Sequence, residues 1–532
     1  MSAKDLEERY AGNLHGVLSC FDRIILVGTM PGACYAQGMT SFLYQQSIRI
    51  FDYAKFAEPL RDRIRERAHQ VCADAGVEIE HVRKSDLRKE ELVARVLATR
   101  GDAPGLVPVI SAMEACPTYV PWHDKGTGKT YLKATQGQCL HYYFYVMDDE
   151  LGRCYLRVPT WVPFSLQFYC NGHSVLARTL SREGIDYLPQ DNAFLRIADV
   201  ARAQELANAC SPDLLHRRLD HYAQQFCPVL DVFGQVYHWS LRQVEYSTDL
   251  MFRSEQILVP LYDAISRQAV LAANAERVSG FLGKKVTPLL AQEICSRRST
   301  RIEGRCIKHT LGAASVKVYD KFSRVLRIET TVNDVSFFKH HRKVEHTNRE
   351  PTRELAPMKK TIYSLIDLRE ILLGCNQRYR AFLSSLDDPR AGERDLQRLS
   401  QPRVGPRPRV KGLNFFAADE QTLLRTLQRD EFNIHGWRRA DLFKYLSMAP
   451  SAMSRQLKRL RDLGIIKKVG HTYRYYLTRL GRSAIAAACA LTRSPAHPLT
   501  RSPAHPLTRS PAHPLQHHPC YGFRTMNSSQ DL

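Results

Sequence analysis

The chain has 532 residues, 44% of them hydrophobic and 24% charged, and a net charge of +22. This length predicts two to four domains with sizeable cores, and the composition excludes a fibrous or wholly disordered protein. The sequence contains no apolar run of about 18 residues and no signal-peptide core, so we expect a cytoplasmic protein without membrane contact, and the positive charge favours a nucleic-acid partner.

We expect residues 1–135 to form an α/β domain, because helix and strand patterns alternate along them. One apolar run ends in glycine and is typical of a buried strand. The expected strands lie at 22–28, 77–82 and 106–111, and the expected amphipathic helices at 59–75 and 89–100. This alternation favours a partly parallel sheet.

Residues 136–400 are expected to form an α+β domain with two antiparallel strand clusters. The first cluster is rich in aromatic residues, and the second lies after a long helical region. The expected order is strands at 139–171, helices at 173–227 and 255–296, strands at 301–332, and a helix at 361–386.

The second strand cluster predicts a three-stranded meander over 304–310, 314–320 and 325–330. Alternation places Lys317 and Tyr319 on one face, together with Arg327 and Glu329 of the next strand. Residues 297–349 carry 13 Lys and Arg against 5 Asp and Glu. We therefore expect a basic sheet face on which Lys317 and Arg327 contact DNA phosphates.

The strand sequences Tyr319-Asp-Lys321 and Arg327-Ile-Glu329 are similar to motifs in plasmid and phage replication initiators. That resemblance implies DNA nicking, with Tyr319 as the nucleophile and Glu329 as a second catalytic residue. A divalent metal would then be held by the segment that follows, through His340, His341, Glu345 and His346. A structural or phosphate-binding sheet is the alternative, and we favour it over a nuclease site.

Two other clusters contain metal-ligand residue types. Zinc is one interpretation of the first, which consists of Cys116, His123, Cys139 and His141. Acid–base or metal chemistry is one interpretation of the second, which consists of His238, Glu245 and Asp249. We favour ordinary burial for the first cluster and an ion-paired strand for the second.

The last quarter of the chain begins with a Pro- and Arg-rich stretch, 401–412, which predicts a linker. After it, helices are expected at 420–427, 438–446 and 451–463, followed by Gly464 and a β-hairpin. The third helix is apolar on the face of Met453, Leu457 and Leu460. Its opposite face is polar and mostly cationic, with Ser451, Arg455, Lys458, Arg459 and Asp462.

This order of elements, with the ending Leu477-Thr-Arg-Leu-Gly-Arg482, resembles winged helix-turn-helix regulators of the MarR type. The resemblance implies that residues 413–490 bind double-stranded DNA through the third helix and the hairpin. Residues 403–482 carry 18 Lys and Arg against 6 Asp and Glu, which supports a phosphate-binding surface. The expected contacts are Ser451, Ser454, Arg455, Lys458, Arg459, Lys467, Lys468 and Arg474.

The tail, 491–532, begins with three copies of an eight-residue Pro-rich repeat and is expected to be disordered. At Phe21-Asp-Arg-Ile24, Leu140-His-Tyr-Tyr-Phe-Tyr145, Arg327-Ile-Glu-Thr330 and Asn333-Asp-Val-Ser-Phe-Phe-Lys-His-His341, the chain also resembles an uncharacterised bacterial protein family. We therefore expect a multidomain α/β and α+β body, a C-terminal winged helix and a disordered tail. The favoured function is a transcriptional regulator or site-specific DNA binder. The alternative is a DNA-processing enzyme of a mobile element. Neither a homodimer nor a divalent metal is required, and both remain open.

Overall fold

The computed structural model describes residues 5–491, with gaps at 84–88, 210, 286, 288–293, 302–303, 348, 387–395, 403–409, 430, 433–435 and 470–471. Most of the expected linker, 401–412, lies outside the described residues, as does the expected tail beyond Leu491. The largest hydrophobic core contains residues from Leu6 to Leu383, and a separate core contains residues from Leu399 to Ala488.

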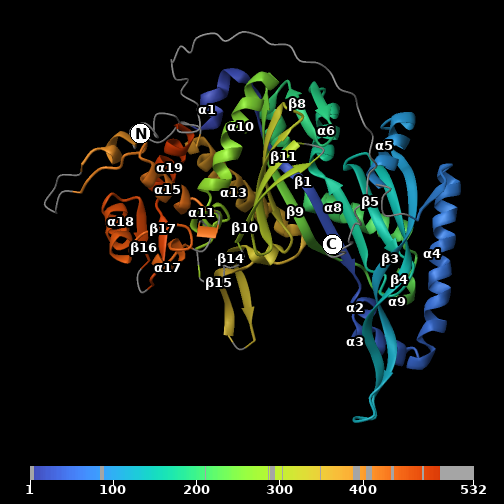
Figure 1. Cartoon of the computed structure of the whole chain (residues 1–532). Helices are drawn as coiled ribbons and strands as arrows, with labels where there is room; N and C mark the ends of the chain where they lie inside the picture. The colour runs from blue at the N-terminus through green and yellow to red at the C-terminus, as the bar shows by residue number, and fades with distance from the viewer. Residues whose placement is uncertain are drawn as a thin grey trace, which may run out of the picture.

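An 11-stranded sheet forms the centre of the body (Figure 1). Its spatial order is β10 (Ile294–Arg301), β11 (Gly304–Leu311), β12 (Ala314–Lys321), β13 (Val325–Val332), β9 (His238–Phe252), β1 (Leu14–Thr29), β6 (Leu166–Asn171), β5 (Gly152–Pro159), β4 (Thr130–Asp148), β3 (Gly105–His123) and β2 (Ile79–Val82). The β2–β3 pair is parallel. The other neighbouring pairs are antiparallel.

The sheet is more continuous than the sequence indicates. The domain boundary expected between residues 135 and 136 falls inside β4, and both predicted ranges contribute strands to the same sheet. β1 has 16 residues where a strand at 22–28 was expected. Residues 14–21, several of them apolar, also pair with β9, so the strand begins well before its expected start.

One face of the sheet is covered by helices of the main core. Helices α4 (Tyr53–Ala75) and α8 (Pro212–Phe226) pack on β3 and β5, respectively. Helices α10 (Glu255–Ala272) and α13 (Leu365–Leu386) pack on β12 and β13. Short helices that complete this side and the ends of the strands are α1 (Leu6–Tyr10), α2 (Pro31–Cys34), α3 (Ala36–Gln45), α9 (Leu230–Phe233) and α11 (Ala275–Phe281).

The opposite face is covered only in part. Helix α5 (Lys89–Arg100) packs there on β3. Around β1, β9 and β13 the cover consists of α6 (Gly172–Arg182), β7 (Tyr187–Gln190), β8 (Ala193–Ile197) and α7 (Val200–Asn208). A small apolar cluster that includes Leu18, Leu176 and Phe194 joins this cover to the sheet. The polar site described below lies beside that cluster.

The C-terminal unit has its own core. It consists of α15 (Ala418–Leu427), α17 (Arg439–Leu442), α18 (Pro450–Asp462), β16 (Ile466–Lys468), β17 (Tyr475–Leu477) and α19 (Arg479–Leu491). The helix expected at 438–446 is only four residues long, whereas the one expected at 451–463 is present as α18. Trp437 pairs with Tyr475 beside the β16–β17 hairpin. Figure 1 shows this unit at one end of the body, with α19 next to α10.

Two hairpins extend away from the layers of the body (Figure 1). One is the distal part of β3 and β4. The other is a separate two-stranded ribbon, β14 (Lys339–His346) and β15 (Arg349–Pro357). In the part of the chain that the structure describes, no helix has both the length and the apolarity needed to cross a membrane.

Candidate functional site

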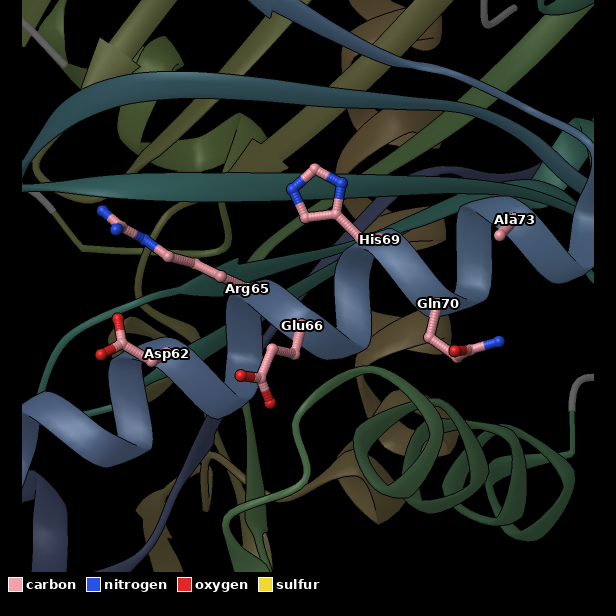
Figure 2. Close-up of a pocket in the computed structure, with 6 residues that line it drawn as sticks. All are labelled: Asp62, Arg65, Glu66, His69, Gln70 and Ala73. Carbon is pink, nitrogen blue, oxygen red and sulfur yellow. The ribbon is translucent and has the colours of Figure 1, made fainter.

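An open hollow on the surface of the body lies along α4, but the side chains that line it do not point toward a common centre. Its lining residues are Asp62, Arg65, Glu66, His69, Gln70 and Ala73. Figure 2 shows that Arg65 and His69 leave one side of the helix, whereas Glu66 and Gln70 leave the other. Because these side chains diverge, they do not form a catalytic or metal-binding group.

The first candidate surface is the outer face of α18. Met453, Leu457 and Leu460 are buried in the core of the C-terminal unit. Pro450 begins the helix, and Gly464, with φ +78°, follows its end. Four residues on the opposite side of the helix are exposed, namely Ser451, Ser454, Arg455 and Lys458. Arg461 continues the same exposed stripe one turn later.

Arg459 does not belong to this face. Its Nη1 atom lies 2.9 Å from Glu420 Oε1, its Nε donates to the carbonyl of Lys411, and its side chain is 15% exposed. Arg459 lies at the edge of the buried face, four residues before the buried Leu463, and its side chain reaches Glu420 of α15. The expected DNA contact at Arg459 is thus replaced by a structural ion pair.

The hairpin residues expected to contact DNA also differ in their exposure and in their partners. Lys468 is exposed, with its ammonium group 5.3 Å from the centre of the Tyr473 ring. Lys467 reaches the body, where its Nζ lies 2.8 Å from Glu276 Oε2 of α11. Arg474 is half-buried. Lys468 therefore remains the hairpin cation that is open to solvent and not committed to the body.

The second candidate site is on the partly covered face of the sheet. Register pairs Lys317 of β12 with Glu329 of β13, and Tyr319 with Arg327. The expectation that these four residues share one face is confirmed. The expectation of an exposed basic surface is wrong for Arg327, which is fully buried, and for Lys317, whose side chain is 16% exposed. Neither side chain can reach a DNA backbone.

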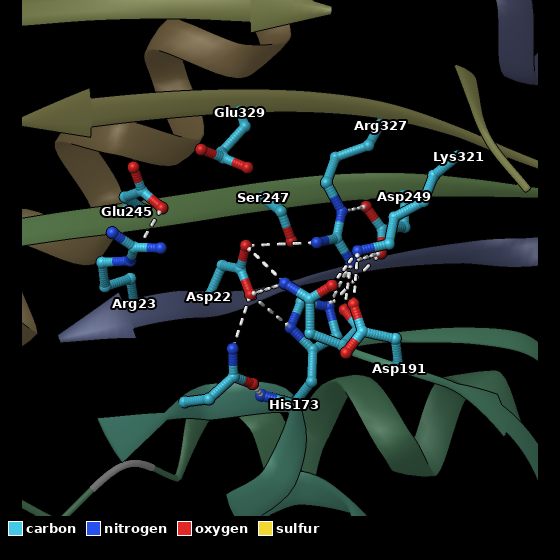
Figure 3. A network of polar contacts seen from close by, with 12 residues as sticks. Asp22, Arg23, His173, Asp191, Glu245, Ser247, Asp249, Lys321, Arg327 and Glu329 are labelled. Atoms are coloured by element: carbon cyan, nitrogen blue, oxygen red, sulfur yellow. Dashed lines mark hydrogen bonds and ion pairs between the residues drawn. The ribbon is translucent and has the colours of Figure 1, made fainter. Parts of the chain in front are cut away.

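Arg327 is the centre of a buried charge network (Figure 3). Its Nη2 lies 2.6 Å from Asp249 Oδ2 and its Nη1 lies 3.1 Å from Asp22 Oδ2. It also donates to the carbonyl of Asn192 in the β7–β8 cover. Burial acts to raise the pKa of Asp22, but Arg327 and His173 outweigh it and hold that pKa well below its usual range. Burial also acts to raise the pKa of Asp249, but the charge of Arg327 and then the hydrogen bond with His173 lower it overall.

A second group of charges lies beside this network. Tyr319 Oη donates to Glu329 Oε2 at 2.5 Å. Lys317 Nζ lies 2.5 Å from Glu329 Oε1 and 3.2 Å from Glu245 Oε1. Burial, reinforced by the neighbouring Glu329 charge, raises the pKa of Tyr319 well above its usual value. The phenol is therefore neutral at physiological pH and acts as a hydrogen-bond donor.

Three carboxylates from three neighbouring strands converge here. One oxygen from each of Asp22, Glu245 and Glu329 lies within 4.8 Å of the others, and all three residues are buried. Burial and the charge of Glu329 raise the pKa of Glu245. An all-oxygen set of this kind fits a hard divalent cation by ligand type. Lys317 already forms ion pairs with two of the three carboxylates, Glu245 and Glu329.

The metal site expected on the His-rich segment is not assembled. His340, His341, Glu345 and His346 all lie on the extended strand β14, so neighbouring side chains point to opposite sides of the ribbon. His340 Nδ1 lies 3.1 Å from Asp367, and His346 Nε2 lies 2.7 Å from Thr352 Oγ1. The two outward residues, His341 and Glu345, are exposed.

The other two predicted clusters are also divided. Cys139 Sγ lies 3.8 Å from His141 Nδ1, but His123 is near the tip of the β3–β4 hairpin, bonded to Thr130. Burial raises the pKa of the Cys139 thiol to about 12, which disfavours a thiolate ligand. His238 is exposed at the end of β9 distant from Asp249. The favoured interpretation, burial for the first cluster, is confirmed for Cys116, Cys139 and His141 but is wrong for His123, which is exposed.

Sequence reasoning missed Asp22 and His173, which complete the charge network. His173 Nε2 lies 3.3 Å from Asp249 Oδ2, and its Nδ1 lies 3.3 Å from Asp22 Oδ1. The available signal was a carboxylate within the apolar run Phe21-Asp-Arg-Ile24, because a buried strand rarely carries an unpaired charge.

Comparisons with protein-family models, with curated proteins and with solved structures give no match for this chain. Function is therefore inferred from the two sites themselves.

Proposed function

We propose that this protein binds double-stranded DNA through its C-terminal unit, as a transcriptional regulator or other site-specific binder. The observation that carries the proposal is the exposed face of α18, where Arg455 and Lys458 stand one turn from Ser451 and Ser454. A helix that is buried on one side and cationic on the other suits the major groove.

The surroundings of α18 support this assignment. The order α15, the Trp437–Tyr475 pairing, α17, α18 and the β16–β17 hairpin is compatible with the winged helix that we propose. Exposed cations flank the helix on both sides, with Arg438, Arg439 and Lys444 around α17 and Lys468 on the hairpin. In Figure 1, α18 lies at the outer end of the molecule, away from the large sheet. A duplex could therefore approach it without meeting the sheet.

Binding of the full-length protein to labelled duplex DNA, measured by fluorescence anisotropy, tests this proposal. The Arg455→Ala/Lys458→Ala double variant should lose at least tenfold in affinity, because a base-reading cation contributes about 1–3 kcal/mol. The matched control is Arg217→Ala/Arg242→Ala, which removes two exposed cations from the body. Equal losses in the two variants, or affinity within about threefold of wild type for the α18 variant, would reject the assignment.

A second candidate function, DNA nicking, is favoured by one specific observation. Tyr319 Oη donates to Glu329, and Glu329 belongs to the cluster of three carboxylates. In such a reaction the Tyr319 oxygen would bond to phosphorus as its proton passes to Glu329, and one P–O ester bond would break. That proton would then pass through solvent to the leaving oxygen, which becomes a DNA hydroxyl end. A divalent cation held by Asp22, Glu245 and Glu329 would stabilise charge on the phosphate.

This second function requires Lys317 to leave Glu329, since its ammonium group neutralises the carboxylate that would take the proton. Supercoiled plasmid incubated with the protein and Mg²⁺ or Mn²⁺ gives a direct test. Nicked circles and a covalent protein–DNA adduct, both abolished by Tyr319→Phe, would establish the enzyme. Plasmid that is bound but stays supercoiled would leave DNA binding as the function.

A further inference from the structure

The C-terminal unit meets the body along a seam that is rich in arginine. On the body side, α11 carries Glu276 and Arg277. On the other side, α19 begins with Arg479 and carries Arg482 one turn later, and α19 packs against α10. Lys467 joins the two sides through its ion pair with Glu276.

In the described part of the chain, the buried Nε of Arg482 lacks the hydrogen-bond partner that a guanidinium N–H normally has. The residue is only 8% exposed, and among the described residues no acceptor lies within hydrogen-bonding distance of its buried Nε. Arg277 lies opposite and is half-buried. Its guanidinium carbon is 4.9 Å from the centre of the Phe382 ring, which has no hydrogen-bond acceptor atom. Buried cations are ordinarily paired and hydrogen-bonded, so this arrangement requires an explanation.

The local charge is also unbalanced. Burial and then Arg277 lower the pKa of Arg482 to about 10, and burial and then Arg479 lower the pKa of Arg277 to about 10. Glu276 is the carboxylate that opposes both shifts. It is 63% exposed and its Oε2 is already engaged by Lys467. The amino-terminal end of the 13-residue helix α19 adds partial positive charge at the same place.

We propose that Arg277 and Arg482 form a binding site for a small oxyanion of the phosphate class, held at the seam between the body and the C-terminal unit. Guanidinium groups pair with phosphate through two parallel N–H···O bonds, one of which would satisfy the Nε of Arg482. A duplex backbone is too large for a side chain that is 8% exposed, so the ligand is a free anion or the phosphoryl group of a small molecule. Because its two arginines come from α11 and α19, the bound anion would hold the C-terminal unit against the body.

Thermal unfolding of the full-length protein in inorganic phosphate, compared with sodium chloride at equal ionic strength, tests the site without any DNA. Phosphate in excess should raise the Tm of the wild-type protein by about 2 °C or more, since a ligand that binds only the folded state stabilises it. Arg482→Gln and Arg277→Gln should each abolish that rise. The exposed Arg217→Gln on α8 is the matched control and should retain it.

Two further results are expected in phosphate-free buffer. Arg482→Gln should be at least as stable as wild type, because the substitution removes a buried cation that is repelled by Arg277. Isothermal titration should detect phosphate binding to wild type and to Arg217→Gln only. A phosphate effect that is equal in wild type and in both seam variants, or absent from wild type, would overturn the proposal. If Arg482→Gln did not fold, Arg277→Gln on the body side would decide the matter alone.

Discussion

Two basic segments of this chain place their cations in opposite environments. Lys317 and Arg327, on the sheet, are buried against Glu329, Asp249 and Asp22. On α18, Arg455 and Lys458 are exposed, and neither forms an ion pair with a described residue. The net charge of a segment therefore does not locate a phosphate-binding surface, because strands distant in sequence can bring the compensating carboxylates.

The largest expected effect comes from removing one acid of the buried network. Asp249→Ala leaves Arg327 buried with only part of its compensation, which should lower the free energy of unfolding by about 3–5 kcal/mol. The control, Asp186→Ala, breaks an equally short Arg–Asp pair whose side chains are 46% and 67% exposed, and should cost less than about 1 kcal/mol. Chemical denaturation followed by circular dichroism measures both, and equal costs would show that the sheet network is not buried in solution.

The same contrast between an exposed and an ion-paired cation exists within α18, in two arginines four residues apart. Arg459→Ala removes an ion pair with Glu420 and bonds to backbone carbonyls, so we expect a loss of about 1.5–3 kcal/mol in stability. Arg455→Ala removes an exposed side chain and should change stability by less than about 0.5 kcal/mol. Denaturation of both variants checks the prediction. A larger loss for Arg455→Ala than for Arg459→Ala would mean that the inner and outer faces of α18 are misassigned.

Lowering the pH should destabilise the sheet network, because its carboxylates lose their charge. The exposed cations of α18 keep their charge in acid. The folded-state pKa values of Asp22 and Asp249 are lowered, so their contribution to stability is present above the unfolded-state pKa of about 3.9. It is lost as the pH falls from there through the lower folded-state values. We expect the melting temperature to decline steeply below about pH 4 and the decline to be shallower in Asp249→Asn. An identical decline in the variant would exclude Asp249 as a source of the pH dependence.

The smallest effect is expected at the seam. Lys467 and Glu276 form a 2.8 Å ion pair, but both side chains are about half or more exposed. Lys467→Ala should therefore change stability by less than about 1 kcal/mol, and high salt should erase the difference. Melting curves of the variant at low and high sodium chloride give the comparison, and a larger, salt-insensitive loss would indicate that this pair is shielded from water.

Alternation along the strands was sufficient to predict which side chains share a face, and it correctly grouped Lys317, Tyr319, Arg327 and Glu329. It could not predict what covers that face. Asp22 is 305 residues from Arg327 in the sequence, and Asn192 reaches it from a separate hairpin. Such contacts depend on sheet order and on the packing of the cover, which leave no local periodicity.

The His-rich segment shows the converse limit. The residue types at 340–346 match those of metal ligands, and their spacing was compatible with one site. The segment is extended in β14, so His340 and His341 lie on opposite sides of the ribbon. Residue type alone therefore predicted a metal site where the backbone conformation does not assemble one.

The central claim is that the exposed cations of α18 bind phosphate and base edges, whereas the buried cations of the sheet do not. The salt dependence of duplex DNA binding by the full-length protein tests it most directly, because the slope of log K against log salt counts released counterions. Arg455→Ala/Lys458→Ala should reduce this slope by up to about two units, while Lys317→Met, verified as folded by circular dichroism, should leave it unchanged. An unchanged slope in the α18 variant together with a reduced slope in Lys317→Met would contradict the account.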